Sequence, residues 1–254
     1  MIYCTLIIPR HLILHLIHHR LIKKLESIGI KGNILNWLTD FLTGRKQRVV
    51  VNHEFSDWIE VLSGVPQGTV LGPLLFLIFV SEIPDLVKSH ISLFADDTKL
   101  YSTCSKNELQ DDLDKVVDWT NQMQMSFNAG KCKVMHLGKE NPVKQYTMLN
   151  SDNERCVLSE AKTEKDLGVI IDNRLSFTEH ITAQVNKANR ALGALKHTFK
   201  YMDKYTFKHL YKSLIRPHVE YASPVWSVRT KYNQDLLERV QRRATKIVPE
   251  LNHL

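Results

Sequence analysis

The stretch I-S-L-F-A-D-D-T-K-L-Y-S, residues 91–102, decides the fold expected for this chain. Apolar residues stand on both sides of two adjacent carboxylates, Asp96 and Asp97. Because aspartate is disfavoured inside strands and its charge is costly to bury, the pair belongs either to a solvated turn or to a metal site. The pattern predicts a tight β-hairpin that exposes both carboxylates at its tip.

The segments after this hairpin favour an α+β fold. A helix is expected next, because apolar residues recur at helical spacing. They are Leu109, Leu113, Val116, Val117 and Met123. The run K-C-K-V-M-H-L-G, residues 131–138, then predicts a strand. A hairpin, a helix and a strand in this order form part of a ferredoxin-like split unit, in which helices cover one face of an antiparallel sheet.

The rest of the chain is expected to be mainly helical. Upstream, apolar spacing predicts two helices within residues 20–42, and a hairpin turning at Asn52-His53. The loop S-G-V-P-Q-G-T-V-L-G-P, residues 63–73, leads into an apolar helix.

Downstream, the run D-L-G-V-I-I-D-N-R-L predicts a strand pair that turns at Asp172-Asn173. Three helices should follow, the second and third stopped by Pro217 and Pro249. Their expected ranges are 178–202, 204–216 and 232–248.

Composition narrows the class of protein. A chain of 254 residues with 43% hydrophobic content can bury a core, and no apolar run is long enough to span a bilayer. Pro9 and Arg10 interrupt the early apolar run, so a secretory signal is not expected. The four cysteines form no C-x-x-C unit, which argues against a disulfide framework and a structural zinc site.

Charge and aromatic residues give two further expectations. Residues 186–254 carry 14 Lys and Arg against 5 Asp and Glu, so the surplus of positive charge is C-terminal and fits contact with phosphate. A metal site is not expected at the early histidines, which lack carboxylate or cysteine partners at ligand spacing. These histidines are His11, His15, His18 and His19. The tryptophans are expected to be core or half-buried anchors. They are Trp37, Trp58, Trp119 and Trp226.

The loop S-G-V-P-Q-G at residues 63–68, followed by F-A-D-D at residues 94–97, resembles the polymerase core of reverse transcriptases from non-LTR (LINE-type) retrotransposons. The likeness continues through G-K-C-K-V-M-H-L-G, K-D-L-G-V-I-I-D, L-Y-K-S-L-I-R-P-H-V-E-Y-A-S-P-V-W and Q-R-R-A-T-K-I-V-P-E-L, and covers nearly the whole chain from His18 onward. It implies an α+β polymerase palm followed by a helical thumb, and RNA-directed DNA synthesis with Mg²⁺, an RNA template, a DNA primer and dNTP.

The resemblance assigns roles to individual residues. Asp96 matches the principal metal ligand of the catalytic hairpin, and Asp97 matches its supporting carboxylate. The loop that contacts template and incoming nucleotide matches Gly64, Pro66, Gln67 and Gly68. Lys131 or Lys133 matches a lysine near the nucleotide's phosphates, and a solvated strand lysine is the alternative. Leu167 and Gly168 resemble the primer-grip turn.

The resemblance also implies a division of the chain. Residues 1–60 would be a remnant of the fingers and palm entry with a degraded metal motif, residues 61–175 the palm, and residues 176–254 a basic, helical thumb-like region. The family implies a nuclear or cytoplasmic location and no membrane.

One expected motif is missing from the chain. The family places a further metal-binding Asp in a motif like Y-L-D-Y-S-K-A-F-D-T before the H-R-L-I-K-K-L segment, where this chain has C-T-L-I-I-P-R-H-L-I-L. If residues 6–14 are written with the codons TTG ATT ATT CCA AGG CAT TTG ATA CTG, reading from the third base gives Asp-Tyr-Ser-Lys-Ala-Phe-Asp-Thr. The hypothesis is a decayed or mispredicted copy that lacks polymerase activity.

Two other functions compete with an inactive polymerase. The first is a residual nucleic-acid-binding protein whose basic C-terminal helices keep affinity for a duplex. The second is a metal phosphohydrolase that uses the Asp pair, although no further acidic or His cluster at ligand spacing supports it.

Overall fold

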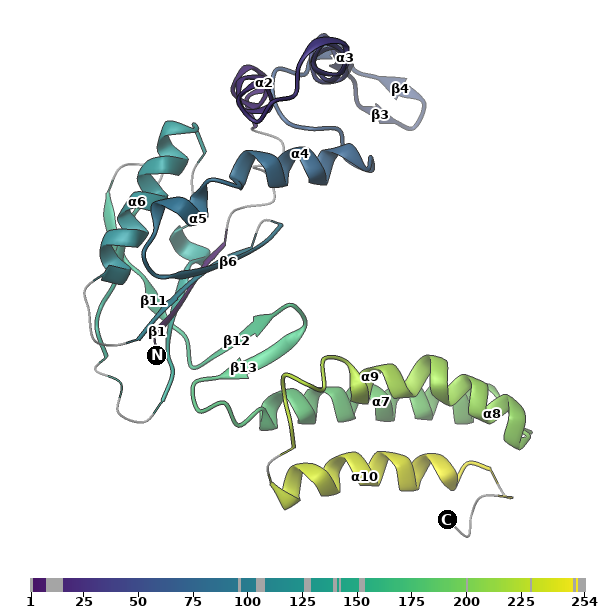
Figure 1. Cartoon of the computed structure of the whole chain (residues 1–254). Helices are drawn as coiled ribbons and strands as arrows, with labels where there is room; N and C mark the ends of the chain where they lie inside the picture. The colour runs from purple at the N-terminus through teal and green to yellow at the C-terminus, as the bar shows by residue number, and fades with distance from the viewer. Residues whose placement is uncertain are drawn as a thin grey trace. The chain divides into compact units, whose positions relative to one another are not determined.

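The structure is a computed structural model that divides into two compact units (Figure 1). Unit 1 comprises Met1–His136 and Glu140–Ala161, and unit 2 comprises Leu137–Lys139 and Lys162–Leu254. The model describes the backbone of residues 2–7 and residues 16–95, 97–103, 108–125, 129–138, 141, 143–150, 154–199, 201–228, 230–248 and 250. Within these ranges no helix combines the length and the apolar character needed to cross a bilayer.

A five-stranded sheet forms the base of unit 1, in the order β11-β8-β1-β7-β6. The strands are β1 (Ile2–Ile7), β6 (His90–Phe94), β7 (Asp97–Ser102), β8 (Lys133–His136) and β11 (Ser159–Glu160). All neighbours are antiparallel except β8 and β11. The sequence did not predict β1, although this strand lies in the middle of the sheet.

The expected hairpin at the Asp pair is confirmed, but Asp97 is the first residue of β7 and half-buried, not exposed at the tip as the sequence suggested. Phe94 at the end of β6 pairs with Asp97 at the start of β7, so residues 95 and 96 connect the strands. Ala95 has a left-handed φ of 51°, as tight hairpin turns require. Asp96 itself lies outside the described residues.

Helix α6 (Glu108–Gln122) packs its predicted apolar stripe into the core of unit 1. Leu100 of β7 and Val134 of β8 belong to the same buried cluster, which fixes one face of the sheet as the face packed in the core. The sequence did not predict the hairpin of β9 (Thr147–Leu149) and β10 (Arg155–Val157).

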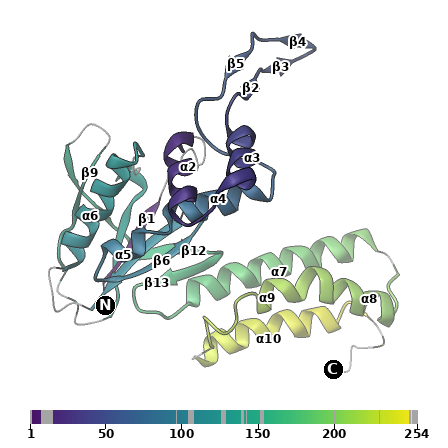
Figure 2. The same cartoon turned by 45° about the horizontal axis from the view of Figure 1, so that its top comes forward.

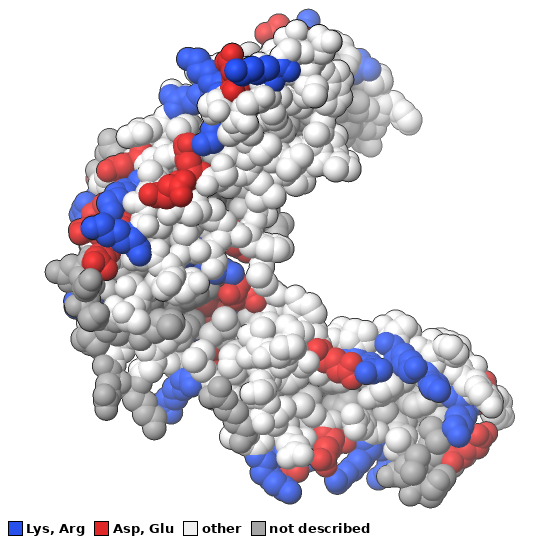
Figure 3. Space-filling model, in the orientation of Figure 1, with Lys and Arg blue, Asp and Glu red and all other residues white. Residues whose placement is uncertain are grey.

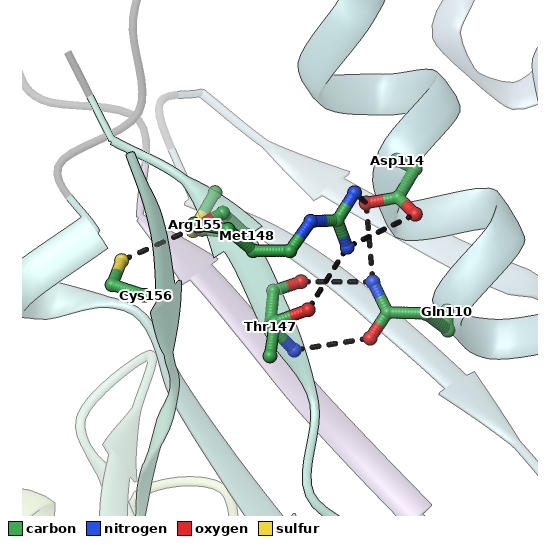
Figure 4. A network of polar contacts seen from close by, with 6 residues as sticks. All are labelled: Gln110, Asp114, Thr147, Met148, Arg155 and Cys156. Carbon is green, nitrogen blue, oxygen red and sulfur yellow. Dashed lines mark hydrogen bonds and ion pairs between the residues drawn. The ribbon is translucent and has the colours of Figure 1, made fainter. Parts of the chain in front are cut away.

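Polar contacts join this hairpin to α6, as Figure 4 shows. Gln110 Nε2 donates to Thr147 O at 2.8 Å, and Thr147 N donates to Gln110 Oε1 at 3.0 Å. Arg155 donates to Thr147 Oγ1 at 2.9 Å and forms an ion pair with Asp114 at 3.3 Å. Met148 of β9 is also buried in the core of unit 1, and Leu149 and Cys156 pack against it. Because each strand has only three residues, no run long enough to show alternating hydrophobicity marks the hairpin in the sequence.

The upper part of unit 1 is helical, as expected. It contains α2 (His18–Ser27), α3 (Gly32–Leu42), α4 (Leu71–Val80) and the short α5 (Ile83–Leu86). Glu82, between α4 and α5, accepts hydrogen bonds from Lys24 of α2 and from Trp119 Nε1 of α6. This carboxylate therefore connects the helices around the core.

A long hairpin, which we call the arm, consists of residues 46–60 and projects from unit 1 (Figure 2). It contains β2 (Lys46–Gln47), β3 (Val50–Val51), β4 (Glu54–Phe55) and β5 (Ile59–Glu60), and it turns at Asn52 and His53 as expected. Every residue of the arm is exposed. The expectation of buried or half-buried tryptophans is therefore wrong for Trp58 of the arm and Trp37 of α3, which are 59% and 56% exposed, and correct for Trp119 and Trp226.

Unit 2 begins with the hairpin of β12 (Thr163–Asp166) and β13 (Val169–Asp172), followed by helices. The sequence suggested a turn at Asp172-Asn173, but Asp166 pairs with Val169, so the hairpin turns at Leu167 and Gly168. These two residues have left-handed φ values of 44° and 89°. Asp172 instead accepts hydrogen bonds from three backbone N–H groups just before the next helix.

The helices of unit 2 are α7 (Thr178–Thr198), α8 (Lys204–Leu210), the π-helix η2 (Tyr211–Ile215), α9 (Arg216–Glu220) and α10 (Lys231–Thr245). The sequence predicted that Pro217 would end the second helical segment, but the segment continues past it. Pro217 lies in the first turn of α9, after the π-helix η2, where a backbone N–H has no hydrogen-bond partner within the helix, so its absence in proline costs little.

The boundary between the units falls after Ala161. The β12–β13 hairpin therefore packs with the helices of unit 2, while the expected palm extends to residue 175. The functional division at residues 60 and 175 stays a prediction.

Candidate active site and nucleic-acid contacts

The register of the central strand defines which residues share one face of the sheet. Ile7 of β1 pairs with Asp97, and Thr5 pairs with both Lys99 of β7 and Lys133 of β8. Directly paired residues and those two positions away lie on the same face of a sheet. Asp97, Lys99 and Lys133 therefore share the face opposite the one that carries Leu100 and Val134 into the core.

The two candidate lysines lie in different elements. Lys131 lies in the exposed 3₁₀ turn η1 (Ala129–Lys131), whereas Lys133 belongs to β8 on the Asp97 face. Lys99 is a further candidate that sequence reasoning missed, and only 7% of it is exposed. The alternation of side chains along β7, counted from Asp97, is the signal that would have found it.

The described residues alone do not form a Mg²⁺ site, and Asp96, the expected principal ligand, lies outside them. Among them, no group of three or more His, Cys, Asp or Glu side chains is placed to hold a metal ion. The position of β1 directly opposite Asp97 belongs to isoleucine, and two lysines share the face. Mg²⁺ requires oxygen ligands and is repelled by nearby cations.

The S-G-V-P-Q-G loop is anchored at Gly64. The Gly64 N–H donates to Leu16 O at 2.8 Å, and its carbonyl accepts from Arg45 Nη2 at 2.7 Å. His18 Nε2 lies 2.8 Å from the same carbonyl oxygen. Gly64 has a φ of 82°, a conformation that favours glycine. Both backbone polar groups of Gly64 are therefore satisfied by residues outside the loop.

Burial of the His18 side chain lowers its pKa, and the charge of nearby Arg45 acts in the same direction, whereas the hydrogen bond to Gly64 acts to raise it. His18 is 6% exposed and its Nε2 lies 3.1 Å from Arg45 Nη2, so both burial and the neighbouring cation disfavour the protonated ring. Sequence reasoning missed both His18 and Arg45, because their common partner is a backbone atom.

The loop is closed on its far side by a second set of contacts. Thr69 Oγ1 donates to Pro66 O at 2.8 Å and accepts from Gly72 N at 3.1 Å. A Cβ at Gly72 would lie 2.7 Å from Pro66 O, so only glycine fits there. Between these anchors Gln67 and Gly68 are exposed, and the loop presents an amide side chain and an accessible backbone to solvent.

A row of cations runs along the helices of unit 2. Lys204, Lys208, Lys212 and Arg216 recur at every fourth position from α8 through η2 to α9, and all are exposed. Figure 3 shows the positive side chains along these helices. An α-helix has about 3.6 residues per turn, so side chains at every fourth position lie progressively further around the helix axis. The π-helix η2 has more residues per turn, which partly reverses this rotation and keeps the four side chains closer to one line. We call these four residues the cation row.

Comparison with known proteins identifies the family of this chain. Residues 15–171 match the family model described as reverse transcriptase (RNA-dependent DNA polymerase), and this chain belongs to that family. Its mixture of helices and strands is consistent with an α+β polymerase.

Its relatives come from non-LTR mobile elements, as the motifs suggested. The chain is 26% identical over 242 residues to the RNA-directed DNA polymerase from mobile element jockey of Drosophila funebris, a match that covers 89% of this chain and 26% of the relative. It is 26% identical over 251 residues to the probable RNA-directed DNA polymerase from transposon BS of Drosophila melanogaster, covering 92% and 27%. The chain thus spans about a quarter of the length of these relatives.

A solved telomerase from Candida albicans, in complex with a TWJ fragment of telomeric RNA, aligns with all of this chain and 44% of its own. The TM-score is 0.45 and the identity 14%.

Proposed function

We propose that this chain is the palm and thumb-like portion of an RNA-directed DNA polymerase from a non-LTR element, and that it does not polymerise as written. In this proposal Asp96 and Asp97 are the catalytic carboxylates, Gly64, Pro66, Gln67 and Gly68 contact template and nucleotide, and Leu167 and Gly168 contact the primer. The RNA template, DNA primer, dNTP and Mg²⁺ are the partners of the active family members.

One observation supports the loss of activity. The family's missing carboxylate belongs to a strand that precedes the H-R-L-I-K-K-L segment, and Ile7 of β1 stands directly opposite Asp97. In the hypothetical shifted frame, the first Asp codon would combine the last base of the codon for Leu6 with the first two bases of the codon for Ile7. With an apolar residue there, the negative charge available for two divalent ions falls below what phosphoryl transfer requires.

Manganese binding tests this proposal without requiring turnover. We expect Ile7→Asp to bind Mn²⁺ at least about tenfold more tightly than the unmodified chain, measured by electron paramagnetic resonance, because a carboxylate is added next to Asp97. Ile7→Asn is the matched control, since it has similar size and no charge. Equal affinity in Ile7→Asp and Ile7→Asn would count against a metal site at this hairpin.

Primer extension tests the lost motif. We expect the unmodified chain to incorporate no nucleotide with Mg²⁺ or Mn²⁺, and replacement of residues 7–14 by D-Y-S-K-A-F-D-T to give extension that Asp96→Asn abolishes. Nucleotide incorporation by the unmodified chain, lost in Asp96→Ala, would refute the inactivity.

The cation row supports a second function, nucleic-acid binding without catalysis. Four exposed cations spaced by about 6 Å of helix rise can follow a phosphate backbone without reading bases. We expect duplex affinity to fall steeply with salt, and Lys208→Ala combined with Lys212→Ala to reduce the slope by about two counterions. Lys23→Ala combined with Lys31→Ala in unit 1 is the control with the same charge change.

A further inference from the structure

Tyr221 lies against the turn of the β12–β13 hairpin. Its hydroxyl donates to Leu167 O at 2.7 Å. A Cβ at Gly168 would lie 3.1 Å from Tyr221 Cε1, so the phenol ring is already in contact with the glycine. The turn is thus held through one hydrogen bond and one surface contact by a residue 54 positions away.

The backbone of Tyr221 is fixed in turn by buried aromatic residues. Trp226 Nε1 donates to Tyr221 O at 2.7 Å, and Trp226 is 2% exposed. Its ring packs on His180 with centroids 5.3 Å apart. His180 Nδ1 accepts a hydrogen bond from Ile170 N of β13 at 3.2 Å. The path from β13 through His180, Trp226 and Tyr221 returns to the hairpin at its turn.

These contacts fix the direction of the turn more than they stabilise the unit. Tyr221 and Leu167 are 52% and 43% exposed, so little apolar surface is buried between them. A hairpin with such short strands is marginal without support, and its tip would otherwise move freely. One neutral hydrogen bond at the surface contributes little to global stability but restricts this tip.

We propose that Tyr221 is a positioning residue for the Leu167–Gly168 turn, and that it sets the place where the turn meets the end of a primer strand. This inference rests on the proposed function. Tyr221 directly follows α9, the helix that carries Arg216 at the end of the cation row. A strand bound along the cation row and the turn at its end are therefore connected through a single short segment of unit 2.

Amide hydrogen exchange of the whole chain tests the positioning. Tyr221→Phe removes the hydroxyl and keeps the ring, and we expect exchange at residues 167–169 to rise about fivefold while exchange in α7 stays unchanged. Tyr201→Phe is the control, because Tyr201 is 95% exposed. Unchanged exchange at the turn in Tyr221→Phe would overturn the proposal, whatever the chain binds.

Binding of nucleic acid tests the consequence. By fluorescence anisotropy we expect the unmodified chain to prefer an RNA–DNA primer–template with a recessed 3′ end over a blunt duplex of equal length. Tyr221→Phe should reduce this preference about threefold or more and leave blunt-duplex affinity unchanged. Gly168→Ala, which strains a backbone at φ 89° and also presses on the Tyr221 ring, should reduce it at least as much.

The two possible failures are distinct. If the unmodified chain shows no preference for the recessed end, the proposed primer contact fails, and with it the role of Tyr221 at a primer. If the preference exists and Tyr221→Phe keeps it in full, the positioning role alone is wrong.

Discussion

Gly64 attaches the S-G-V-P-Q-G loop to the rest of unit 1, since both of its backbone polar groups bind residues outside the loop. Its φ of 82° would strain the backbone of any residue other than glycine. The exposed part of the loop, Gln67 and Gly68, therefore starts from a fixed peptide. A substitution at His18 or Arg45 would act on the loop without touching a ligand.

Acid should weaken this anchor. Burial lowers the pKa of His18 below its usual 6.5, so the unfolded chain binds the proton more readily than the folded chain. The free energy of unfolding is then retained above pH 6.5 and falls as the pH drops below that value. We expect urea unfolding of unit 1 to lose stability from about pH 7 to about pH 5, and His18→Gln to flatten that slope.

His19→Gln is the matched control, because His19 is adjacent and exposed. An identical pH slope in the unmodified chain and in His18→Gln would show that the proton binds elsewhere. His180 of unit 2 has a pKa lowered by its burial and by Lys187, so unit 2 should weaken in the same direction.

Two glycines in helices differ in whether a side chain would fit at their position. Gly72, near the start of α4, has no room for a Cβ, because Pro66 O would lie 2.7 Å away. Gly193, inside α7, has nothing within 4 Å of its Cβ position. We expect Gly193→Ala to raise the free energy of unfolding by about 1 kcal/mol, because alanine favours the helix.

Gly72→Ala should instead lower that free energy by about 1–3 kcal/mol, as overpacking does, and disturb the loop at Pro66. Denaturant titration of both variants provides the measurement. If both variants changed the free energy of unfolding equally, Pro66 must move away from α4 at little energetic cost when Gly72 is replaced.

An element could be predicted from the sequence when the residues that determine it lie within its own segment. The helices α2, α3, α6 and α10 and the Asp hairpin follow from spacing and turn residues within each segment, and the sequence predicted them. The turn at Leu167 was misplaced because the Asp172-Asn173 pair also consists of residues that favour turns, whereas Asp172 in fact accepts hydrogen bonds from backbone N–H groups of the segment before α7.

Parts of the candidate site depend on distant pairing and could not be predicted. The Asp97 face requires the register of β1, β7 and β8, which lie far apart in the sequence. The anchors at Gly64 and Leu167 use backbone carbonyls, which have no sequence signature. The sequence predicted the residue types of the loop and hairpin, but not the residues that hold them.

At the scale of the whole molecule, the described residues form two hydrophobic clusters, one in each unit. Because each unit has its own core, we expect two unfolding transitions. Phe76→Ala should shift only the transition of unit 1, and Leu192→Ala only that of unit 2, each by about 2–5 kcal/mol. Calorimetry gives the number of transitions, and tryptophan fluorescence of Trp119 or Trp226 assigns them.

A single transition that both variants shift equally would show that the units fold as one.

The charges divide in a similar way, since the basic surplus lies in residues 186–254, all within unit 2. High salt should therefore alter nucleic-acid binding through unit 2 with little effect on the core of unit 1.

The arm has a practical consequence for anyone handling this protein. It contributes no residue to the buried cluster of unit 1, although it carries Lys46 and Arg48 on open backbone. Trypsin should cut there before it reaches either core, and the two pieces should remain associated through the packed helices. A fluorophore or affinity tag inserted at Asn52-His53 would report on the protein without disturbing its interior.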